Sequence, residues 1–499
     1  MTEKKLVQKV IIAGGGTAGW MAAATLAATI GKRLQITLIE SDDIPTVGVG
    51  EATVPSLLTI HQLLKIREDD FLRAVNGTYK LGIMFENWTK LNHKYFHSFG
   101  KSGLSCWAAG FHHFWVRANE QKMAKDYAAY SLESVAAEKG KFAHIKDPQL
   151  NYAYHLDSAA YGQFLRSIAQ QHGTTRIEGK IDRVNVHSQS GHIESLTLAS
   201  GQVVDGDLFI DCTGFRSLLL GQALKVGYND WSDVLPANAA YAVQTESHRP
   251  AVPFTRSIAL DAGWRWQIPL QHRVGNGVVF STEFKSEQSA LDDLLQGIDG
   301  TPLTDPRLIR FTTGQRKEFW HKNCVSVGLS SGFIEPLEST SIHLIQQAII
   351  WLISLFPTEG VDENLVNRFN QQMRVETETI RDFIVLHYHL QQRDDHEFWR
   401  YLRNMKVSDR LQQIMDLFAN NGTIVEEQDD LFAENSWVQV MMGQGLTPKQ
   451  YHPIVDMMSD RDLNTFMRQQ ESQIQQQLAN LPMHTQFIQY LLQAQTRAN

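Results

Sequence analysis

The sequence predicts an α/β fold, in which a parallel sheet near the N-terminus is followed by β-sheet insertions and then by a helical module. Two observations support this prediction. An apolar, β-branched run at residues 10–13 leads directly into a glycine-rich turn and an alanine-rich segment, which is the order strand, loop, helix. Residues 357–499 are polar, glutamine-rich and helical in their period, with no glycine cluster.

The glycine-rich turn has the spacing G-x-G-x-x-G, formed by Gly14, Gly16 and Gly19 with Thr17 and Ala18 between the last two. In this spacing the first glycine permits a tight turn and the second lets a pyrophosphate approach the backbone. The third lets the helix pack closely on the strand. Free N–H groups at the helix start then face the phosphates. The turn therefore predicts a dinucleotide site.

The acid that completes such a site is Glu40. It ends a second apolar strand at residues 34–39 and follows the loop at the spacing of about twenty residues where a carboxylate accepts ribose hydroxyls. Residues 47–55, which include two glycines and one proline, then indicate an extended strap near the cofactor. An ordinary surface loop would have the same composition.

A third apolar strand ends in Asp211-Cys212-Thr213-Gly214, far downstream of the glycine turn. This order suits an FAD-binding Rossmann-type domain of the flavin monooxygenase kind, interrupted by inserted segments. A nicotinamide enzyme would more often show a compact run of β-α units, so the flavin interpretation is preferred.

Composition limits the classes of partner. The chain has 499 residues, is 43% hydrophobic and has a formal charge of -8. That length predicts two closely packed modules, and the acidic balance argues against nucleic acid or an anionic membrane. We expect no membrane span and no signal peptide, because the first apolar residues run straight into the glycine turn. The three scattered cysteines fit a reducing cytoplasm, so we expect a cytoplasmic protein.

We expect residues 1–345 to form the FAD-binding module, with a helical, aromatic-rich insertion at about 56–150. Residues 346–499 would form a C-terminal helical module that completes the substrate pocket. The aromatic residues of the insertion fit either a core or an aromatic-lined cavity. Within it Lys80 has apolar neighbours, although a lysine is most often a solvated surface charge.

A second glycine-rich turn precedes an apolar helix expected at residues 343–356. Thr340 and Ser341 stand at its start, where unsatisfied backbone N–H groups hold a small anion well. Glu338 beside them fits either a structural acid at a helix start or a catalytic carboxylate. His387 and His389 invite a metal interpretation, but residues i and i+2 on a helix point apart, so we expect no metal.

Residues 262–270 read as a strand with Trp264 and Trp266 on one face, which by itself suggests a pair of core tryptophans. The segment Trp264-Arg265-Trp266-Gln267-Ile268-Pro269 also matches the W-x-W-x-I-P signature of the flavin-dependent halogenases of the tryptophan halogenase family. Beside it stand the Gly14–Trp20 loop, the strap, the Lys80 segment and Pro336-Leu337-Glu338-Ser339-Thr340. The chain resembles this family over most of its length.

The resemblance implies an enzyme that depends on a separate flavin reductase for reduced FAD. Reduced FAD, oxygen and chloride or bromide give hypohalous acid, which moves through an internal tunnel to a lysine at the substrate. By motif that lysine is Lys80, and Glu338 is the second catalytic acid. The products are halogenated electron-rich aromatics of the indole type, formed by electrophilic substitution.

Further residues are carried over by motif only. Thr340 and Ser341 fall at the halide site, and His97 and Phe99 match a pair that packs on the substrate. Ser341 stands where tryptophan-processing members tend to have glycine, so we expect a halide site of different size. Ser436-Trp437-Val438 stands where paired tyrosines would hold the amino-acid end of tryptophan, which disfavours free tryptophan as substrate. The expected flavin contacts, including those of the glycine turn and strap, are Gly14, Gly16, Thr17, Ala18, Gly19, Glu40, Val49, Glu51, Ala52, Leu329 and Ile342.

Two alternatives stay open at this point. An FAD-dependent aromatic monooxygenase would share the glycine turn and Asp211, but would not explain the tryptophan signature or Lys80. A non-catalytic flavin-binding or partner-docking protein would keep the fold alone. The sequence leaves homodimer formation open.

Overall fold

The computed structural model describes residues 6–44, 50–146, 149–425 and 430–494. The chain forms two compact units, each assembled from three separate stretches. Unit 1 comprises Met1–Gly77, Leu156–Ser232 and Phe311–Glu378, and unit 2 comprises Thr78–His155, Asp233–Arg310 and Thr379–Asn499. The chain therefore alternates between the two units, and the expected boundary near residue 345 stays a prediction.

Unit 1 contains a six-stranded sheet in the order β20-β21-β12-β1-β2-β8. The strands are β1 (Lys9–Ala13), β2 (Gln35–Glu40), β8 (Thr175–Glu178), β12 (Leu208–Asp211), β20 (Trp320–His321) and β21 (Cys324–Ser326). All pairs are parallel except β20 with β21. The central β1 is buried from Val10 to Ala13, because helices or other strands cover both faces of such a sheet, and this explains its unbroken apolar run.

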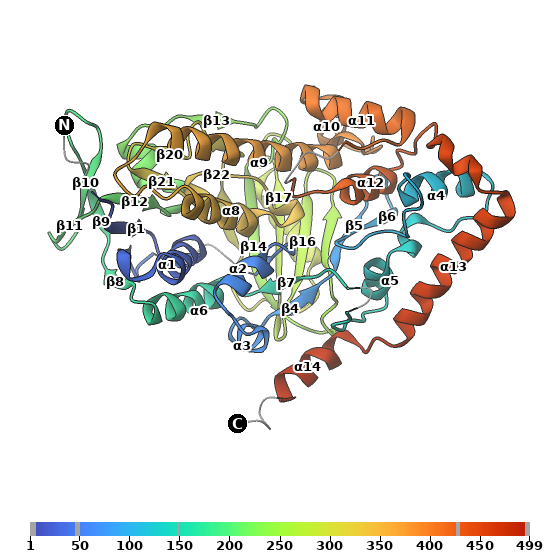
Figure 1. The fold of residues 1–499 in the computed structure, drawn as a ribbon, viewed down its shortest axis with the longest axis horizontal. Coiled ribbons are helices and arrows are strands. Elements are labelled where there is room, and N and C mark those ends of the chain that lie inside the picture. The colour runs from blue at the N-terminus through green and yellow to red at the C-terminus, as the bar shows by residue number, and fades with distance from the viewer. Residues whose placement is uncertain (1–5, 45–49, 147–148, 426–429, 495–499) are drawn as a thin grey trace. The chain divides into compact units, whose positions relative to one another are not determined.

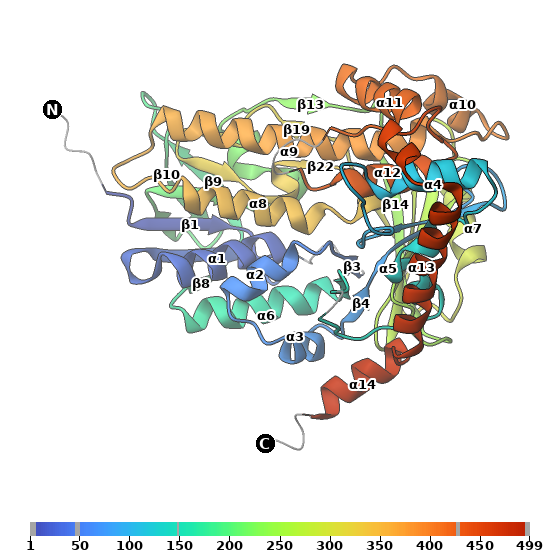
Figure 2. The ribbon, with the colours of Figure 1, turned by 45° about the vertical axis from the view of Figure 1, so that its right-hand side comes forward.

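Three helices of unit 1 pack beside this sheet, namely α1 (Thr17–Thr29), α6 (Ser158–Gln171) and α8 (Ser341–Ser354). Helix α1 contacts both α6 and α8, as Figures 1 and 2 show. Its small alanine side chains are buried on nearly every face and allow close approach. The remaining elements of unit 1 are α2 (Leu57–Leu63), α3 (Glu68–Ala74), β3 (Glu51–Ala52), β9 (Ile181–Val186), β10 (Ile193–Leu198), β11 (Val203–Asp205), β13 (Tyr228–Asp230), β19 (Gly314–Arg316) and β22 (Gly332–Phe333), with short turns between them.

Unit 2 contains a seven-stranded sheet in the order β18-β14-β17-β16-β15-β5-β6. Its strands are β5 (Gly82–Glu86), β6 (Lys94–Ser98), β14 (Ala239–Glu246), β15 (Thr255–Ala259), β16 (Trp264–Pro269), β17 (Arg273–Phe280) and β18 (Arg307–Arg310). Only β5 and β15 pair in parallel. Strand β16 holds Trp264 and Trp266 on one buried face, with ring centroids 6.1 Å apart, as the period of two predicts.

A short antiparallel pair in unit 2 joins β4 (Thr78–Lys80) to β7 (Ala153–Leu156). The long helix α9 (Glu363–His389) contains residues of both units. The other helices of unit 2 are α4 (Phe111–Glu120), α5 (Leu132–Glu138), α7 (Glu287–Gly297), α10 (Glu397–Asn404), α11 (Asp409–Asn421), α12 (Glu434–Gly443), α13 (Asp460–Ala479) and α14 (His484–Ala494).

Residues 56–150 were expected to be mainly helix and loop, and that expectation missed β4, β5 and β6. These strands are buried on both faces, so they lack the alternation of polar and apolar residues that marks a half-buried strand. The helical prediction for the C-terminal part is confirmed in α9 to α14.

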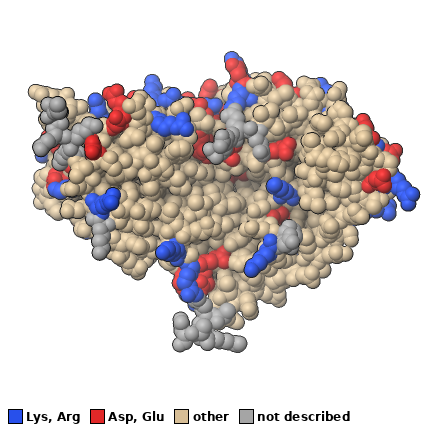
Figure 3. All heavy atoms as spheres, viewed as in Figure 1, with Lys and Arg blue, Asp and Glu red and all other residues tan. Residues whose placement is uncertain are grey.

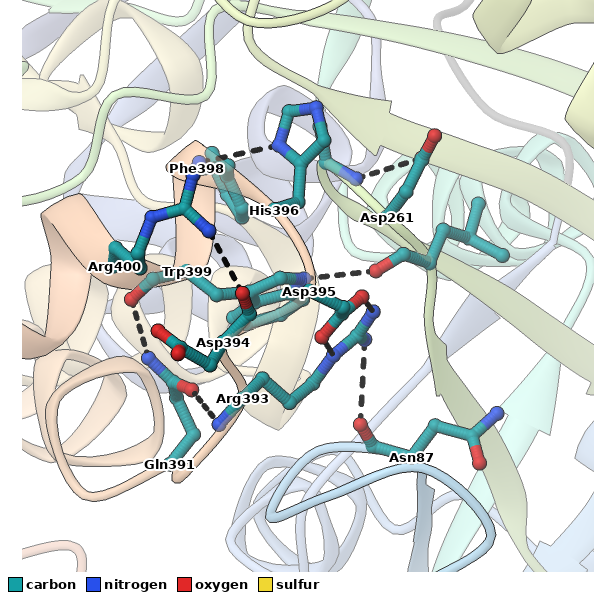
Figure 4. A network of polar contacts seen from close by, with 12 residues as sticks. Asn87, Asp261, Gln391, Arg393, Asp394, Asp395, His396, Phe398, Trp399 and Arg400 are labelled. Carbon is teal, nitrogen blue, oxygen red and sulfur yellow. Dashed lines mark hydrogen bonds and ion pairs between the residues drawn. The ribbon is translucent and has the colours of Figure 1, made fainter.

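A polar network fixes the connection between α9 and α10 in unit 2 (Figure 4). Arg393 forms a two-bond ion pair with Asp395 and donates to the carbonyl oxygen of Asn87. The Trp399 ring lies 4.6 Å from the Arg393 guanidinium, and its Nε1 donates to the carbonyl of Leu260, four residues before β16. The network thus anchors this connection to the turn that precedes the paired tryptophans.

Among the residues that the structure describes, no helix is both long enough and apolar enough to cross a membrane. On the face drawn in Figure 3, basic and acidic side chains lie dispersed over a mainly uncharged surface.

Candidate active site

The glycine turn of unit 1 is shaped by contacts that exclude side chains. Gly14 has a φ of +106°, and a Cβ there would lie 2.2 Å from the carbonyl oxygen of Cys212. A Cβ on Gly19 would lie 1.9 Å from the carbonyl oxygen of Gly14. At Gly16, by contrast, an added Cβ would meet nothing within 4 Å. The space beside Gly16, at the start of α1, is therefore open to a ligand, and a helix start offers N–H groups without partners in the helix.

The Glu40 carboxylate lies against this turn. An added Cβ on Gly15 would come within 1.6 Å of its Oε2, so the neighbouring position also requires glycine. Arg176 holds the other oxygen with a hydrogen bond of 2.6 Å, and the Nε1 of Trp20 donates to Oε2 at 3.3 Å. The carboxylate is thus fixed beside the glycine turn, and its predicted role as a ribose acceptor stays a prediction.

The described part of the strap begins at Gly50, so Val49 lies outside the described residues. Glu51 and Ala52 form the short strand β3. Burial raises the pKa of Glu51 to about 7. Burial together with the charge of Glu51 raises the pKa of Tyr161, whose hydroxyl lies 3.1 Å from Nε2 of His61.

Asp211 has a structural part in unit 1. Its carboxylate accepts hydrogen bonds from the backbone N–H groups of Thr213, Leu219 and Leu220, and from the Thr213 hydroxyl at 2.6 Å. Asp211, at the end of β12, thereby holds the backbone of residues 213–220 in place. The Asp-x-Thr-Gly motif organises the backbone next to Gly14 rather than offering a free acid.

The residues from Leu329 to Ile342 lead into α8. Leu329 is half-buried in the turn Gly328–Ser330, and Ile342 is buried in the first turn of the helix. A Cβ on Gly328 would lie 2.9 Å from the Cβ of Ala18, so this turn and the phosphate-loop helix are in contact. The predicted flavin contacts Ala18, Leu329 and Ile342 thus belong to neighbouring elements of one unit.

The expected anion site stands at the start of α8. Thr340 is the N-cap residue but makes no side-chain cap, and the first turn contains no acidic residue. The N–H groups of that turn therefore have no partner within the helix. Thr340 and Glu338 are both 1% exposed, while Ser341 is partly exposed. The preceding Ser339 has a φ of +61°.

A buried chain of hydrogen bonds supports this helix start. His343, in the first turn of α8, places Nδ1 2.8 Å from the hydroxyl of Ser56 and Nε2 2.7 Å from a carboxylate oxygen of Glu376. Ser56 directly precedes α2 and follows the strap by one residue. These hydrogen bonds thus connect the end of the strap, α8 and α9 within unit 1.

Lys80 lies in unit 2 and is fully buried, with 0% of its surface exposed. Its Nζ is 5.1 Å from the ring centroid of Phe99. Register places Lys80 opposite Ala153 on β7, and the backbone N–H of Phe99 donates to the carbonyl of Leu81. The interpretation of Lys80 as a solvated surface charge is therefore wrong.

Two neutral histidines hold the strand that carries Lys80. The Thr78 hydroxyl donates to the carbonyl of Pro269 at 2.7 Å, so its oxygen accepts from Nδ1–H of His155 at 3.0 Å. His484 donates from Nδ1 to the carbonyl of Ala251 and accepts from the Tyr79 N–H at its Nε2. Burial lowers the pKa of His484 to about 4. Burial, with the charge of Lys80, holds the pKa of His155 well below 6.5.

His97 belongs to an aromatic cluster whose other members come from the C-terminal stretch. The His97 ring lies 5.5 Å from Phe383 and 6.2 Å from Phe432. Phe383 stacks on Phe432 at 3.8 Å and meets Trp437 edge-on at 4.9 Å. The sequence did not single out Phe383 or Phe432, because neither stands in a motif. Trp437, from the segment that departs from the tryptophan-processing pattern, is part of this cluster.

The predicted residues thus gather as two groups. The glycine turn, Glu40, Glu51, Ala52, Leu329 and the start of α8 belong to unit 1, and Lys80, His97 and Phe99 belong to unit 2.

His387, one of the two histidines considered for a metal site, forms a hydrogen bond of 2.8 Å with the Tyr95 hydroxyl. Over the described ranges, no group of three or more His, Cys, Asp or Glu side chains is placed to hold a metal ion.

A mainly parallel sheet whose first strand leads into a glycine-rich turn is typical of Rossmann-type enzymes that bind a dinucleotide, and comparison with known proteins identifies the family. A family model described as Tryptophan halogenase matches residues 9–460. The chain therefore belongs to the tryptophan halogenase family, which confirms the resemblance and the fold class. It is a flavin-dependent halogenase, an enzyme whose cofactor is FAD.

Individual relatives support the same family assignment. Tryptophan 7-halogenase RebH of Lentzea aerocolonigenes is 34% identical over 480 residues, which are 89% of this chain and 90% of RebH. The structure of Xcc4156, a flavin-dependent halogenase from Xanthomonas campestris, has 49% identity and a TM-score of 0.96, covering 98% of this chain and 99% of that one. BrvH, a flavin-dependent halogenase from Brevundimonas sp. BAL3, has 42% identity and a TM-score of 0.93, covering 97% and 99%.

Proposed function

We propose that this halogenase uses chloride or bromide to halogenate a small, electron-rich aromatic of the indole type, with reduced FAD supplied by a separate flavin reductase. The observation that carries the proposal is the fully buried Lys80 amine, 5.1 Å from the ring of Phe99. Lysine is rarely found fully buried, and this amine lies beside an aromatic ring of the kind that packs against a flat substrate.

The residues of unit 1 fit FAD. Gly14, Gly16 and Gly19 leave the start of α1 open to a pyrophosphate, and Arg176 holds the Glu40 carboxylate where ribose hydroxyls would donate to it. When bound in reduced form, FAD supplies the electrons with which oxygen and a halide give hypohalous acid. Thr17, Ala18, Glu51, Ala52, Leu329 and Ile342 are the further proposed contacts, together with Val49.

The halide would lie at the start of α8. Thr340 and Ser341 bring hydroxyl groups to a helix N-terminus whose first-turn N–H groups point out of the helix, and this end carries positive partial charge. The burial of Thr340 limits competing water at this helix start, which strengthens the attraction for an anion.

Lys80 would pass the halogen on. Its Nζ–H either donates a hydrogen bond to the oxygen of hypohalous acid, or its neutral amine takes the halogen, forming an N–X bond while the O–X bond breaks and water leaves. The ring carbon then binds the halogen and loses its proton. Burial excludes water that would otherwise consume the oxidant. Glu338 is the proposed second catalytic acid, which takes the ring proton or stabilises the cationic ring.

We infer the substrate class from the aromatic cluster around His97, which lies on β6, the strand that ends just before Phe99. His97, Phe383, Phe432 and Trp437 form an aromatic cluster, and this composition suits an uncharged ring better than the ammonium and carboxylate of free tryptophan. We therefore propose indole, a substituted indole or a phenol as substrate.

The test is an incubation with FAD, a flavin reductase, NADH, bromide and indole, followed by mass analysis of the product. A bromine isotope pair supports the proposal, and a gain of one oxygen atom would instead identify an aromatic monooxygenase. NADH alone should not bleach the bound flavin, because the chain has no second nucleotide fingerprint. Rapid bleaching without the reductase would contradict the reductase requirement.

A further inference from the structure

The backbone on both sides of Phe99 is held by one helix of unit 2. Strand β6 ends at Ser98, and the chain then bends through Phe99 and Gly100. Helix α12 packs against β6 and contributes two carboxamides to this bend, from Asn435 and Gln439.

Gln439 bonds to the residue before Phe99 and to the residue after it. Its Oε1 accepts from the backbone N–H of Ser98 at 2.7 Å, and its Nε2 donates to the carbonyl of Gly100 at 3.0 Å. This orientation of the amide is fixed, since an N–H can be matched only by the oxygen and a carbonyl only by the nitrogen. The side chain is 5% exposed, so water does not readily replace these bonds.

Asn435 continues the same pattern one helical turn earlier. Its Nδ2 donates to the carbonyl of Gly100 at 2.5 Å, and its Oδ1 accepts from the N–H of Ser102 at 3.1 Å. Residues i and i+4 lie on one face of a helix, so the two amides form a single row along α12. That row satisfies backbone groups of residues 98, 100 and 102, as a neighbouring strand would.

Phe99 has little freedom between these anchors. Its own N–H donates to the carbonyl of Leu81 at 3.0 Å, next to Lys80. Position 100 requires glycine, because a Cβ there would lie 1.7 Å from a carboxylate oxygen of Glu133. The backbone that carries the Phe99 ring is therefore held by hydrogen bonds on three consecutive residues, and the ring lies 5.1 Å from the Lys80 amine.

We propose that Gln439 and Asn435 are positioning residues that fix the Phe99 ring beside Lys80 and thereby set which aromatic substrates the enzyme prefers. This inference rests on the proposed function of Lys80 and Phe99. Neither amide takes part in the chemistry. They act through the backbone of the residue that would pack on the substrate.

The test is a competition between indole and phenol for bromination in one vessel, with FAD, flavin reductase, NADH and limiting bromide. The ratio of the two brominated products reports relative kcat/KM and does not depend on how much enzyme is folded. Gln439→Leu has similar volume but removes both hydrogen bonds. Since one neutral hydrogen bond corresponds to about a fivefold change, we expect the product ratio to move about fivefold or more toward that of free hypobromous acid.

Gln444→Leu is the matched control. Gln444 directly follows α12, is 1% exposed and bonds to the Tyr95 hydroxyl and the carbonyl of His387, so it is also a buried amide but does not contact residues 98–102. This variant should be less stable and keep the wild-type product ratio. Asn435→Ala, at a less buried position, should shift the ratio in the same direction as Gln439→Leu and serves if the latter does not fold.

The outcomes separate the two levels of the proposal. If the wild-type enzyme brominates with a ratio different from free hypobromous acid, and Gln439→Leu and Asn435→Ala keep that ratio, the positioning role is wrong. If the wild-type enzyme makes no brominated product, the proposed function itself fails.

Discussion

Unit 1 and unit 2 build their candidate sites in different ways. In unit 1 the groups that would face the cofactor and the halide are mostly backbone N–H groups, presented by glycines and by the starts of α1 and α8. In unit 2 the groups are side chains, namely the buried amine of Lys80 and aromatic rings from two distant stretches of the chain.

This difference has a consequence for how each site tolerates change. A site made from backbone depends on small residues and on loop conformation, so its chemistry stays constant while neighbouring side chains vary. A site made from side chains changes its preference whenever a ring or its support moves. We therefore expect unit 1 to set the oxidant and unit 2 to set the substrate.

The largest effect is expected for Lys80. With a chemical trap present to remove free hypobromous acid, Lys80→Ala should lower the rate of indole bromination by at least about a thousandfold, because it removes the group that would carry the halogen. FAD affinity, measured by flavin fluorescence, should stay within twofold of wild type, about the noise of such a titration. Lys80→Met, which keeps most of the volume, is the control for the space left behind, and bromination by this variant at the wild-type rate would remove the amine from the mechanism.

Glu338 should come next. Glu338→Gln keeps the size of the side chain but cannot take a proton, so turnover should fall by about a hundredfold, the usual contribution of one acid–base group. The measurement is kcat for indole bromination, with FAD binding as the control. An unchanged kcat would make Glu338 a structural acid beside the helix start, the alternative that its position also allows.

The low pKa of His484 predicts how the stability of the folded protein changes as the pH is lowered. Because burial lowers its pKa to about 4, the unfolded chain binds this proton below pH 6.5 while the folded chain does not. Stability is thus unaffected above pH 6.5 and falls as pH drops from 6.5 to 4, by about 3 kcal/mol from this residue. The urea midpoint should fall less steeply with acid in His484→Gln than in the wild type. Equal slopes would show that the imidazole is not held neutral.

The smallest effect is expected at Ser341. Ser341→Gly leaves the backbone N–H groups of the helix start in place, so activity should persist and the preference between chloride and bromide should change by only about two- to fivefold. The measurement is the ratio of kcat/KM for the two halides. Complete loss of activity would show that the halide site depends on this side chain rather than on the backbone.

The same difference explains what the sequence could predict. The glycine turn was predictable because its shape requires glycine at fixed spacing, as at Gly14 and Gly19, while the binding roles of Glu40 and of the start of α8 stay predictions. Strand β4 and its neighbours were missed, because strands buried on both faces show no alternation.

The supports of the aromatic cluster were also not predictable from local pattern. Gln439 and Phe383 are separated from Phe99 by hundreds of residues, and a glutamine in a helix is ordinarily a solvated side chain. The family resemblance predicted a catalytic role for Lys80, whereas residue type alone favoured a solvated surface lysine. Its burial became visible only when β4 was placed beside β7.

One measurement tests the division between the units most directly. Lys80→Ala is incubated with FAD, reductase, NADH and bromide, and both free hypobromous acid, captured by a chemical trap, and bromoindole are quantified. We predict that the variant oxidises bromide at the wild-type rate and forms bromoindole no faster than free hypobromous acid does in solution. Loss of both products, or retention of enzymatic bromoindole formation, would contradict the assignment of the oxidant to unit 1 and of halogen transfer to unit 2.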